Sequence, residues 1–388
     1  MDAGGYGGAE PGAVPPVHPA MRTWLLVLGL ALVALAVFDA LRTTLGRGGG
    51  PLTRAVSQAV RRLVQSGPGQ RISGALFRQL GVVVLLAVVT AWVGLLWGGW
   101  SLVFLASDGA VVSATTGAPA SAWSRVYFAG YTLVTLGLGD YNPVGAPWQM
   151  LTTATALSGL FVLTLAISYV LPVLQAALHR RATAAALWGL GATPEETIRT
   201  TWSQSRGCDT LEQHLIGLTP SLTLLAQQHI AYPVLHHFHG DERREALAPS
   251  LAVLDEALSV VEHGMDADCL APGALRPARA AIATLLDRLE SQSVGPSDRP
   301  PPPPSLAGLR RDGFPARSDA DFREALREDA CDRRRRLLLG LVQAEGWTWD
   351  HVLGDAPDDP TDDGPDDAKT AGDDEGTCAV SEEAVEGA

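Results

Sequence analysis

Six consecutive residues, Thr135 to Asp140, read TLGLGD and alternate glycines with larger side chains. An ion that sheds its water needs a stack of oxygen ligands, and backbone carbonyls supply one when successive residues aim them at a single axis. That geometry alternates right-handed and left-handed dihedrals, and glycine takes the left-handed ones without strain. Asp140 is expected at the outer mouth, where a carboxylate attracts cations. The expected carbonyl ligands of a dehydrated cation are Thr135, Leu136, Gly137, Leu138 and Gly139.

The nine residues TLGLGDYNP that begin at Thr135 resemble the selectivity filter of potassium channels, whose usual form is T-x-G-[YFL]-G-D. An aromatic stretch at 127–131 precedes them, as in the pore helix of that family. The resemblance covers about residues 80–181 and implies a two-helix pore that conducts potassium ions. Leu138 stands where most members have tyrosine, so the hydroxyl that braces the filter from behind is missing.

The resemblance also implies a role for the helix that follows the filter. Gly159 fills the place of the hinge glycine of that family, and Pro172 resembles the proline bend near the inner gate of some relatives. We therefore expect the inner helix to gate the pore by bending at one of these two residues.

Three apolar runs are long enough to cross a hydrocarbon core of ~30 Å. Between the second and third lies a short segment that enters and returns, and such backbone is tolerated at membrane depth where it lines a cavity or is buried in protein. The predicted fold is an all-α membrane protein with three transmembrane helices and a re-entrant loop. The expected elements are a first transmembrane helix at 21–45, an outer helix at 80–105, a pore helix at 123–134, the filter at 135–140 and an inner helix at 148–178.

The linker at 46–79 indicates the orientation in the membrane. Residues 42–78 hold seven arginines and no acid, and short basic loops are cytoplasmic. We expect a multi-pass protein of the cell membrane with its N-terminus outside and its C-terminus in the cytoplasm. Valines and leucines between 56 and 64 lie opposite Arg61 and Arg62 at helical spacing, which fits either a helix on the inner membrane surface or a plain linker helix. Asp39 is expected at the interface beside Arg42.

The net charge of −13 belongs to the tail, because residues 350–388 carry 14 acids and one base. Residues 1–20 and 355–388 have the Gly-, Pro- and Asp-rich composition of disordered segments. We expect no nucleic-acid partner. The partners expected are potassium ions, the lipid bilayer and further copies of the chain.

The second half is predicted to be helical and soluble. Periodic apolar segments at 209–218, 221–231, 244–263 and 274–292 place a bundle at 182–294, and a Thr-Pro-Glu-Glu start at Thr193 opens its first helix. A stiff proline-rich linker at 295–304 precedes a C-terminal helical segment at 305–354, with its main helix running from Ser318 or Asp319 to about Glu345. Arg333–Arg336 are expected on a solvated or phospholipid-facing surface. The four cysteines, Cys208, Cys269, Cys331 and Cys378, are expected as free thiols.

A histidine cluster is the one unusual feature of this half. Imidazoles at this density could bind a transition metal or sense pH near neutrality. The interpretation that we favour is a polar helix corner with satisfied histidines, because Pro233 interrupts the helix. The candidate sensing residues are His229, His236, His237 and His239.

One loop supplies a quarter of a carbonyl ring, so the sequence predicts a homotetramer. No apolar run carries arginine at every third position, which argues against a voltage sensor. We expect a potassium-selective channel, with no enzymatic activity and no cofactor besides the transported K⁺, gated by an unidentified ligand or signal sensed in the cytoplasmic half. The alternative is a non-conducting, membrane-tethered sensor or scaffold whose cytoplasmic domain binds a partner or a metal. A weaker alternative makes that half a metal enzyme built on the histidines.

Overall fold

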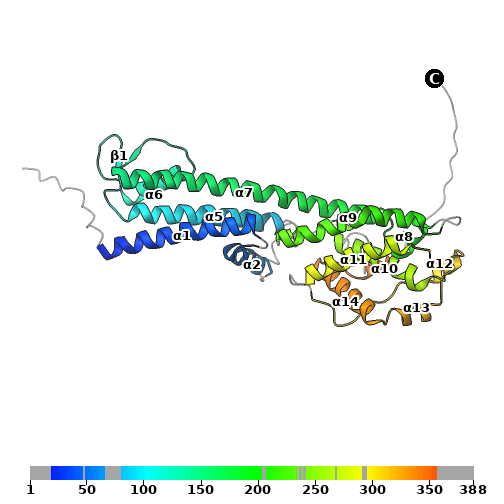
Figure 1. Cartoon of the computed structure of the whole chain (residues 1–388). Coiled ribbons are helices and arrows are strands. Elements are labelled where there is room, and N and C mark those ends of the chain that lie inside the picture. Colours follow the sequence, from blue (N-terminus) through cyan, green and yellow to red (C-terminus); the bar gives the residue numbers. More distant parts are fainter. Residues whose placement is uncertain are drawn as a thin grey trace, which may run out of the picture.

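The computed structural model describes residues 19–46, 49–65, 80–202, 207–232, 234–235, 238, 242–266, 269–290 and 295–355. Three of its helices are long and apolar enough to cross a membrane: α1 (Pro19–Leu45), α5 (Leu80–Leu105) and α7 (Gly145–Trp188). They run side by side, and a helical domain lies at one end of them (Figure 1). The predicted all-α membrane fold is confirmed. The expected disordered ends at 1–20 and 355–388 lie almost wholly outside the described residues.

Two glycines let α1 and α5 approach closely. A Cβ on Gly29 would lie 2.6 Å from the carbonyl oxygen of Gly99, and a Cβ on Gly99 would lie 2.8 Å from that of Gly29. Small residues at such a crossing allow backbone-to-backbone packing, which is the main source of helix association within lipid. The first transmembrane helix is therefore packed tightly on the outer helix of the pore domain.

α7 is longer than the inner helix expected at 148–178. It runs unbroken from Gly145 to Trp188, and its 44 residues span about 66 Å at 1.5 Å per residue. A hydrocarbon core of ~30 Å accommodates less than half of that length. The remainder projects into the helical domain, so one continuous helix belongs to both halves of the molecule (Figure 1).

The short re-entrant segment is built as predicted, with one addition. The pore helix is α6 (Ala122–Leu133), and it is preceded by a strand, β1 (Val111–Ser113). A second strand, β2 (Tyr141–Pro143), follows the TLGLGD segment and pairs antiparallel with β1, so that Val112 lies opposite Asn142. Three-residue strands carry no periodicity signal, which is why the sequence gives no indication of them.

Two buried hydrogen bonds join helices of the membrane region. Trp100 is buried and donates its indole N–H to Ser158 Oγ at 2.9 Å. Asp39 is fully buried within the protein and accepts the indole N–H of Trp92 at 2.9 Å. In both pairs a polar side chain forms a hydrogen bond with a residue of another helix. Local sequence patterns do not reveal that partner.

The helical domain consists of a bundle around one fully buried helix, α10 (Leu247–Ser259). The expected start at Thr193 is confirmed, because Thr193 Oγ1 accepts the N–H of Glu196 at 3.1 Å. The two segments expected at 209–218 and 221–231 form one helix that includes Pro220, and the final helix is broken in two at 326–328. The other elements are α8 (Pro194–Thr201), α9 (Asp209–Ala231), η2 (Arg243–Glu245), η3 (Val260–Gly264), α11 (Pro272–Glu290), α12 (Ala307–Arg311), α13 (Asp319–Ala325), α14 (Asp329–Ala344) and α15 (Asp350–Leu353).

The proline-rich segment packs against this bundle, so it does not act as a free linker. Pro301 and Pro304 are buried, and the carbonyl oxygen of Pro302 accepts hydrogen bonds from Arg335 and Trp349, each at 3.1 Å. An extended proline segment has no internal hydrogen bonds, so its carbonyls are available to side chains. It joins α14 to the C-terminal end of the domain.

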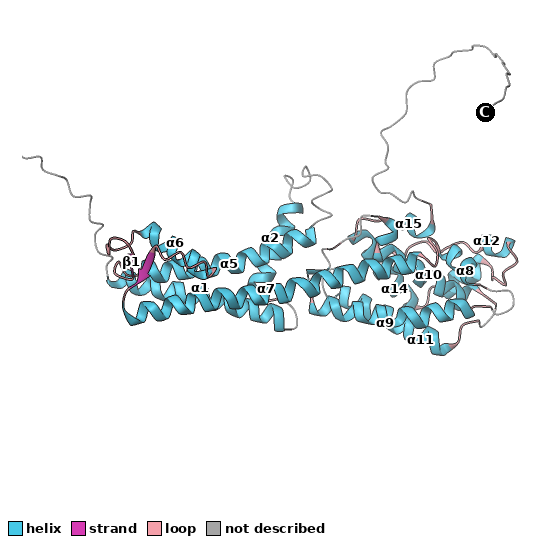
Figure 2. Cartoon of the chain, turned by 90° about the horizontal axis from the view of Figure 1, so that it is seen from above, coloured by secondary structure: helices cyan, strands magenta, loops and turns pink. Residues whose placement is uncertain are grey.

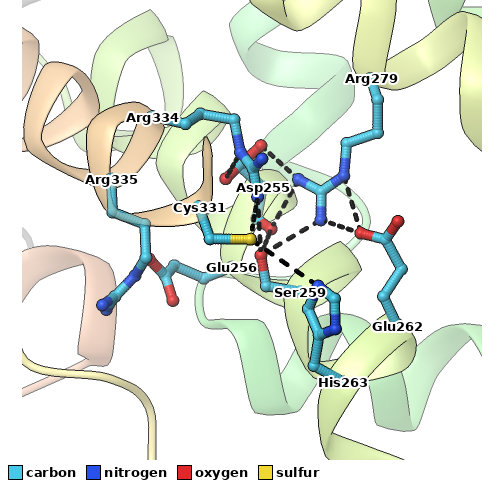
Figure 3. Close-up of polar contacts among 9 residues, drawn as sticks. All are labelled: Asp255, Glu256, Ser259, Glu262, His263, Arg279, Cys331, Arg334 and Arg335. Carbon is cyan, nitrogen blue, oxygen red and sulfur yellow. Dashed lines mark hydrogen bonds and ion pairs between the residues drawn. The ribbon is translucent and has the colours of Figure 1, made fainter. Parts of the chain in front are cut away.

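The arginine run on α14 is also internal. Arg334 pairs with Asp255 at 2.9 Å, and Arg335 pairs with Glu256 at 2.6 Å; both acids are completely buried on α10 (Figure 3). Burial alone would raise the pKa of Asp255, but the guanidinium groups of Arg279 and Arg334 outweigh it and hold that pKa below its ordinary value. The expected solvated or lipid-facing surface is thus wrong for these two arginines. Their partners lie 79 residues earlier in the chain, beyond any local pattern.

The expectation of free thiols is wrong for two cysteines. Cys208, at the start of α9, forms a disulfide with Cys269, and their Cα atoms are 5.3 Å apart. Cys331 is a free and buried thiol, whose sulfur lies 3.8 Å from Nε2 of His263. The spacing of 61 residues resembles no familiar disulfide framework, so the sequence carried no signal for this bond.

Candidate ion-conduction pathway

The N-terminal end of α6 is held by polar contacts. Ser121 caps its first turn, because its hydroxyl accepts the N–H of Ser124 at 3.1 Å. Arg125 is buried and donates to the carbonyl of Ser107 at 2.9 Å and to the carboxylate of Asp108 at 3.0 Å. The sequence alone did not indicate this role of Arg125, because its partners lie in the loop after α5. These contacts fix the direction in which the helix points.

The backbone that follows α6 alternates in handedness. Thr135, Gly137 and Gly139 have φ of 57°, 59° and 79°, whereas Leu136 and Leu138 between them stay at negative φ. Such alternation turns successive carbonyls toward one side of the strand. Left-handed conformations were expected at the two glycines. Thr135 is an addition, and it is the one non-glycine residue with positive φ in the described part of the chain.

Backbone hydrogen bonds anchor this segment at both ends. The N–H of Leu136 bonds the carbonyl of Tyr131 at 2.8 Å, which ties the inner end to the last turn of α6. The N–H of Ala114 bonds the carbonyl of Asp140 at 2.9 Å, which ties the outer end to the loop after β1. The segment between these anchors is therefore fixed at both ends.

Tyr141 supports the outer end from the side, and sequence reasoning missed it. Its hydroxyl donates to Ser124 Oγ at 3.0 Å, and its carbonyl accepts the hydroxyl of Tyr131 at 3.2 Å. Tyrosine hydroxyls thus join α6 to the residue that follows Asp140, although Leu138 itself brings no hydroxyl. The signal was present in the sequence, as an aromatic residue directly after Asp140.

All six residues from Thr135 to Asp140 are exposed in the single chain, and Leu136 is 61% exposed. In the described part of the chain, the carboxylate of Asp140 makes no hydrogen bond, so it is available to solvent and ions at the C-terminal end of the segment.

The two expected hinge residues lie in different surroundings on α7. Gly159 passes the end of the pore helix so closely that a Cβ would lie 1.9 Å from the carbonyl oxygen of Leu133. Pro172 lies 13 residues further on, within the continuous helix, and is half-buried. Gly159 therefore has a packing reason to be glycine. Pro172 removes one backbone hydrogen bond from α7 and so weakens the helix at that point.

The structure places one of the four candidate histidines. His229 is buried in the last turn of α9, and its Nδ1 lies 2.9 Å from the carbonyl of Leu225. Burial lowers the pKa of His229 to about 4, although the bond with Leu225 opposes this shift. His229 is therefore a neutral core residue. His236, His237 and His239 lie outside the described residues, and within the described ranges no group of three or more His, Cys, Asp or Glu could hold a metal ion.

The fold and the site together define a helical membrane protein with a re-entrant pore loop. A family described as "Ion channel" matches residues 81–176, which span α5, α6, the TLGLGD segment and most of α7. The chain belongs to this ion channel family. It is 30% identical over 343 residues to YdjJ of Bacillus subtilis (strain 168), an uncharacterized membrane protein, with 87% of this chain and 99% of the relative covered. No solved structure matches the chain.

Proposed function

We propose that the protein is a homotetrameric, potassium-selective channel that is not gated by voltage. The observation that carries the proposal is the positive φ of Thr135, Gly137 and Gly139 in an exposed, anchored strand. Carbonyls aimed at one axis replace the hydration shell of a dehydrated cation when four copies surround that axis. The carbonyls of residues 135–139 coordinate K⁺, and Asp140 raises the local cation concentration at the mouth.

Gating in this proposal passes through α7. The helix borders the filter at Gly159 and enters the helical domain, where Arg180 is buried and pairs with Glu345. A movement of the domain is carried along the helix to Pro172, where the weakened backbone bends. The domain is on the cytoplasmic side, since the basic linker at 46–79 is expected there. An unidentified cytoplasmic ligand or signal biases the bend.

Gly137→Ala tests conduction directly. Both the full-length protein and the variant are reconstituted into liposomes, and potassium flux is followed with a proton-coupled dye. Gly117→Ala is the matched control, because Gly117 has a similar φ of 66° and open space for a Cβ but lies outside the filter. We expect the filter variant to lose flux while it still assembles, and the control to keep it. Undiminished flux in Gly137→Ala would refute the filter assignment.

Selectivity and assembly need separate measurements. Reversal potentials in asymmetric potassium and sodium solutions report the selectivity, and native mass spectrometry reports the number of chains. We expect a potassium preference and a mass of four chains. A wild-type protein that assembles without conducting would favour the non-conducting sensor.

A further inference from the structure

We propose that α2 (Pro51–Gln65) is a docking site for the headgroups of anionic phospholipids. This helix lies at the end of α1 and α5 that faces the helical domain, and it projects sideways across their axis (Figure 2). The linker sequence by itself left two placements open, on a membrane surface or as a plain linker. A helix that runs across the axis of transmembrane helices lies along the plane of the membrane.

The start of α2 is fixed by a carboxylate from another helix. Asp39 of α1 accepts the N–H of Leu52 at 2.7 Å and, through its other oxygen, the N–H and hydroxyl of Thr53 at 3.2 and 2.7 Å. The first N–H groups of a helix have no partners within the helix, and a negative charge there complements its dipole. A Cβ on Gly50 would lie 2.1 Å from this carboxylate, so glycine makes room for the cap. The direction of α2 is thereby set by α1.

The two faces of α2 differ. Leu52, Val56 and Val60 pack against the core of the membrane helices. Arg54 lies on the opposite face and Arg62 lies between the two, and both side chains are exposed. A helix with this division buries its apolar side and presents its basic side at a bilayer surface.

The charge on this surface is uncompensated within the described ranges. Residues 40–107 contain seven arginines and no aspartate or glutamate. Arg42, near the end of α1, is exposed like Arg54 and Arg62, and the structure pairs none of the three with a carboxylate. Guanidinium groups bind phosphate oxygens in a bidentate manner, and the nearest phosphates to a helix at this depth are those of the lipid. Anionic phospholipid is therefore the occupant that the position and the charge favour.

Binding of fluorescent phosphatidylglycerol to the full-length protein in neutral detergent micelles tests the proposal. Fluorescent phosphatidylcholine serves as the second probe. The variant is Arg54→Gln/Arg62→Gln, and the matched control is Arg311→Gln/Arg323→Gln, which removes two exposed charges from the helical domain. We expect phosphatidylglycerol binding to weaken roughly fivefold per arginine removed from α2, with no change in the control or with phosphatidylcholine. Equal binding by the wild type and the α2 variant, or an equal loss in the control, would overturn the proposal.

Two further measurements separate folding and competition from lipid binding. Thermal unfolding should be the same for wild type and α2 variant, since both arginines are exposed, and a fall in Tm matching the loss of binding would count against the site. The acidic segment at 356–388 is the alternative occupant. Deletion of this segment is expected to leave phosphatidylglycerol binding unchanged. A more than fivefold gain in that binding would show that the tail, and not lipid, occupies these arginines in the full-length protein.

Discussion

Arg180 of α7 forms a buried ion pair with Glu345, the residue that ends α14, although 165 positions separate them in the chain. Arg180 also donates to the carbonyl of Phe238, and the other carboxylate oxygen of Glu345 accepts the N–H of Ala248 at 3.3 Å. The pair joins the long pore-domain helix to the start of α10. Arg243 adds a second link, because its guanidinium lies 4.8 Å from the ring centre of Trp188 at the end of α7.

Glu345→Gln is expected to destabilise the helical domain. The change leaves the Arg180 guanidinium buried without its counter-charge, and breaking one partner of a buried pair costs about 3–5 kcal/mol. The measurement is thermal unfolding of the full-length protein in detergent. Glu324→Gln is the control, because its pair with Arg327 is more than 70% exposed and should contribute at most about 1 kcal/mol. Equal shifts in Tm for the two variants would contradict the account.

The buried His229 predicts a pH dependence of stability. Its pKa is about 4 in the folded protein and about 6.5 when unfolded, so between these values the unfolded chain binds the proton and the folded chain does not. The free energy of unfolding contributed by His229 is therefore present above pH 6.5 and decreases by about 3 kcal/mol as the pH falls to 4. Glu256 has the opposite effect, because burial raises its pKa to about 6. Between about pH 4.5 and 6 the folded chain holds the proton of Glu256 and the unfolded chain does not, so this contribution to the free energy of unfolding increases as the pH falls.

Unfolding of wild type and His229→Gln, compared from pH 4 to 7.5, isolates the histidine term. The variant should show a flatter fall in stability below pH 6.5. An unchanged slope would mean that His229 is charged in the folded protein or exposed to solvent.

Gly159→Ala is expected to disturb the junction of α7 and the pore helix. The added methyl group collides with the carbonyl of Leu133, and overpacking of this kind costs about 1–3 kcal/mol. Because the proposed filter begins two residues after Leu133, the potassium flux that we propose should fall together with Tm. Gly98→Ala on α5, where a Cβ meets nothing within 4 Å, is the matched control and should keep both. Normal stability in Gly159→Ala would argue against the tight contact.

Reduction of the Cys208–Cys269 disulfide is expected to destabilise the helical domain. The bond closes a loop of about 60 residues, and the chain-entropy estimate for a loop of that size is about 4 kcal/mol. Alkylation of the unreduced, denatured protein followed by intact-mass measurement should label Cys331 and Cys378 and leave the other two cysteines unlabelled. Addition of a reductant should lower Tm for the wild type and not for a Cys208→Ser/Cys269→Ser variant. Four labelled thiols without reductant would show that the bond is absent.

Local patterns predicted several elements of the membrane half. The lengths of α1 and α5, the pore helix and the left-handed glycines follow from hydrophobic run length and from the dihedral freedom of glycine, which are properties of neighbouring residues. The same holds for the capped start of α8 at Thr193 and the capped start of α13 at Ser318.

Tertiary structure decided what the buried polar residues do. Asp39 serves as the cap of α2, Arg334 and Arg335 turn inward to acids of α10, and Gly159 meets a carbonyl of the pore helix. A charged or polar side chain in a low-dielectric interior is stable where a partner is supplied, and here the partner comes from a distant segment. The sequence by itself determined which segments enter the membrane and where backbone carbonyls can line a path. Which side chains hold those segments together depended on contacts that form after folding, and no local spacing encodes them.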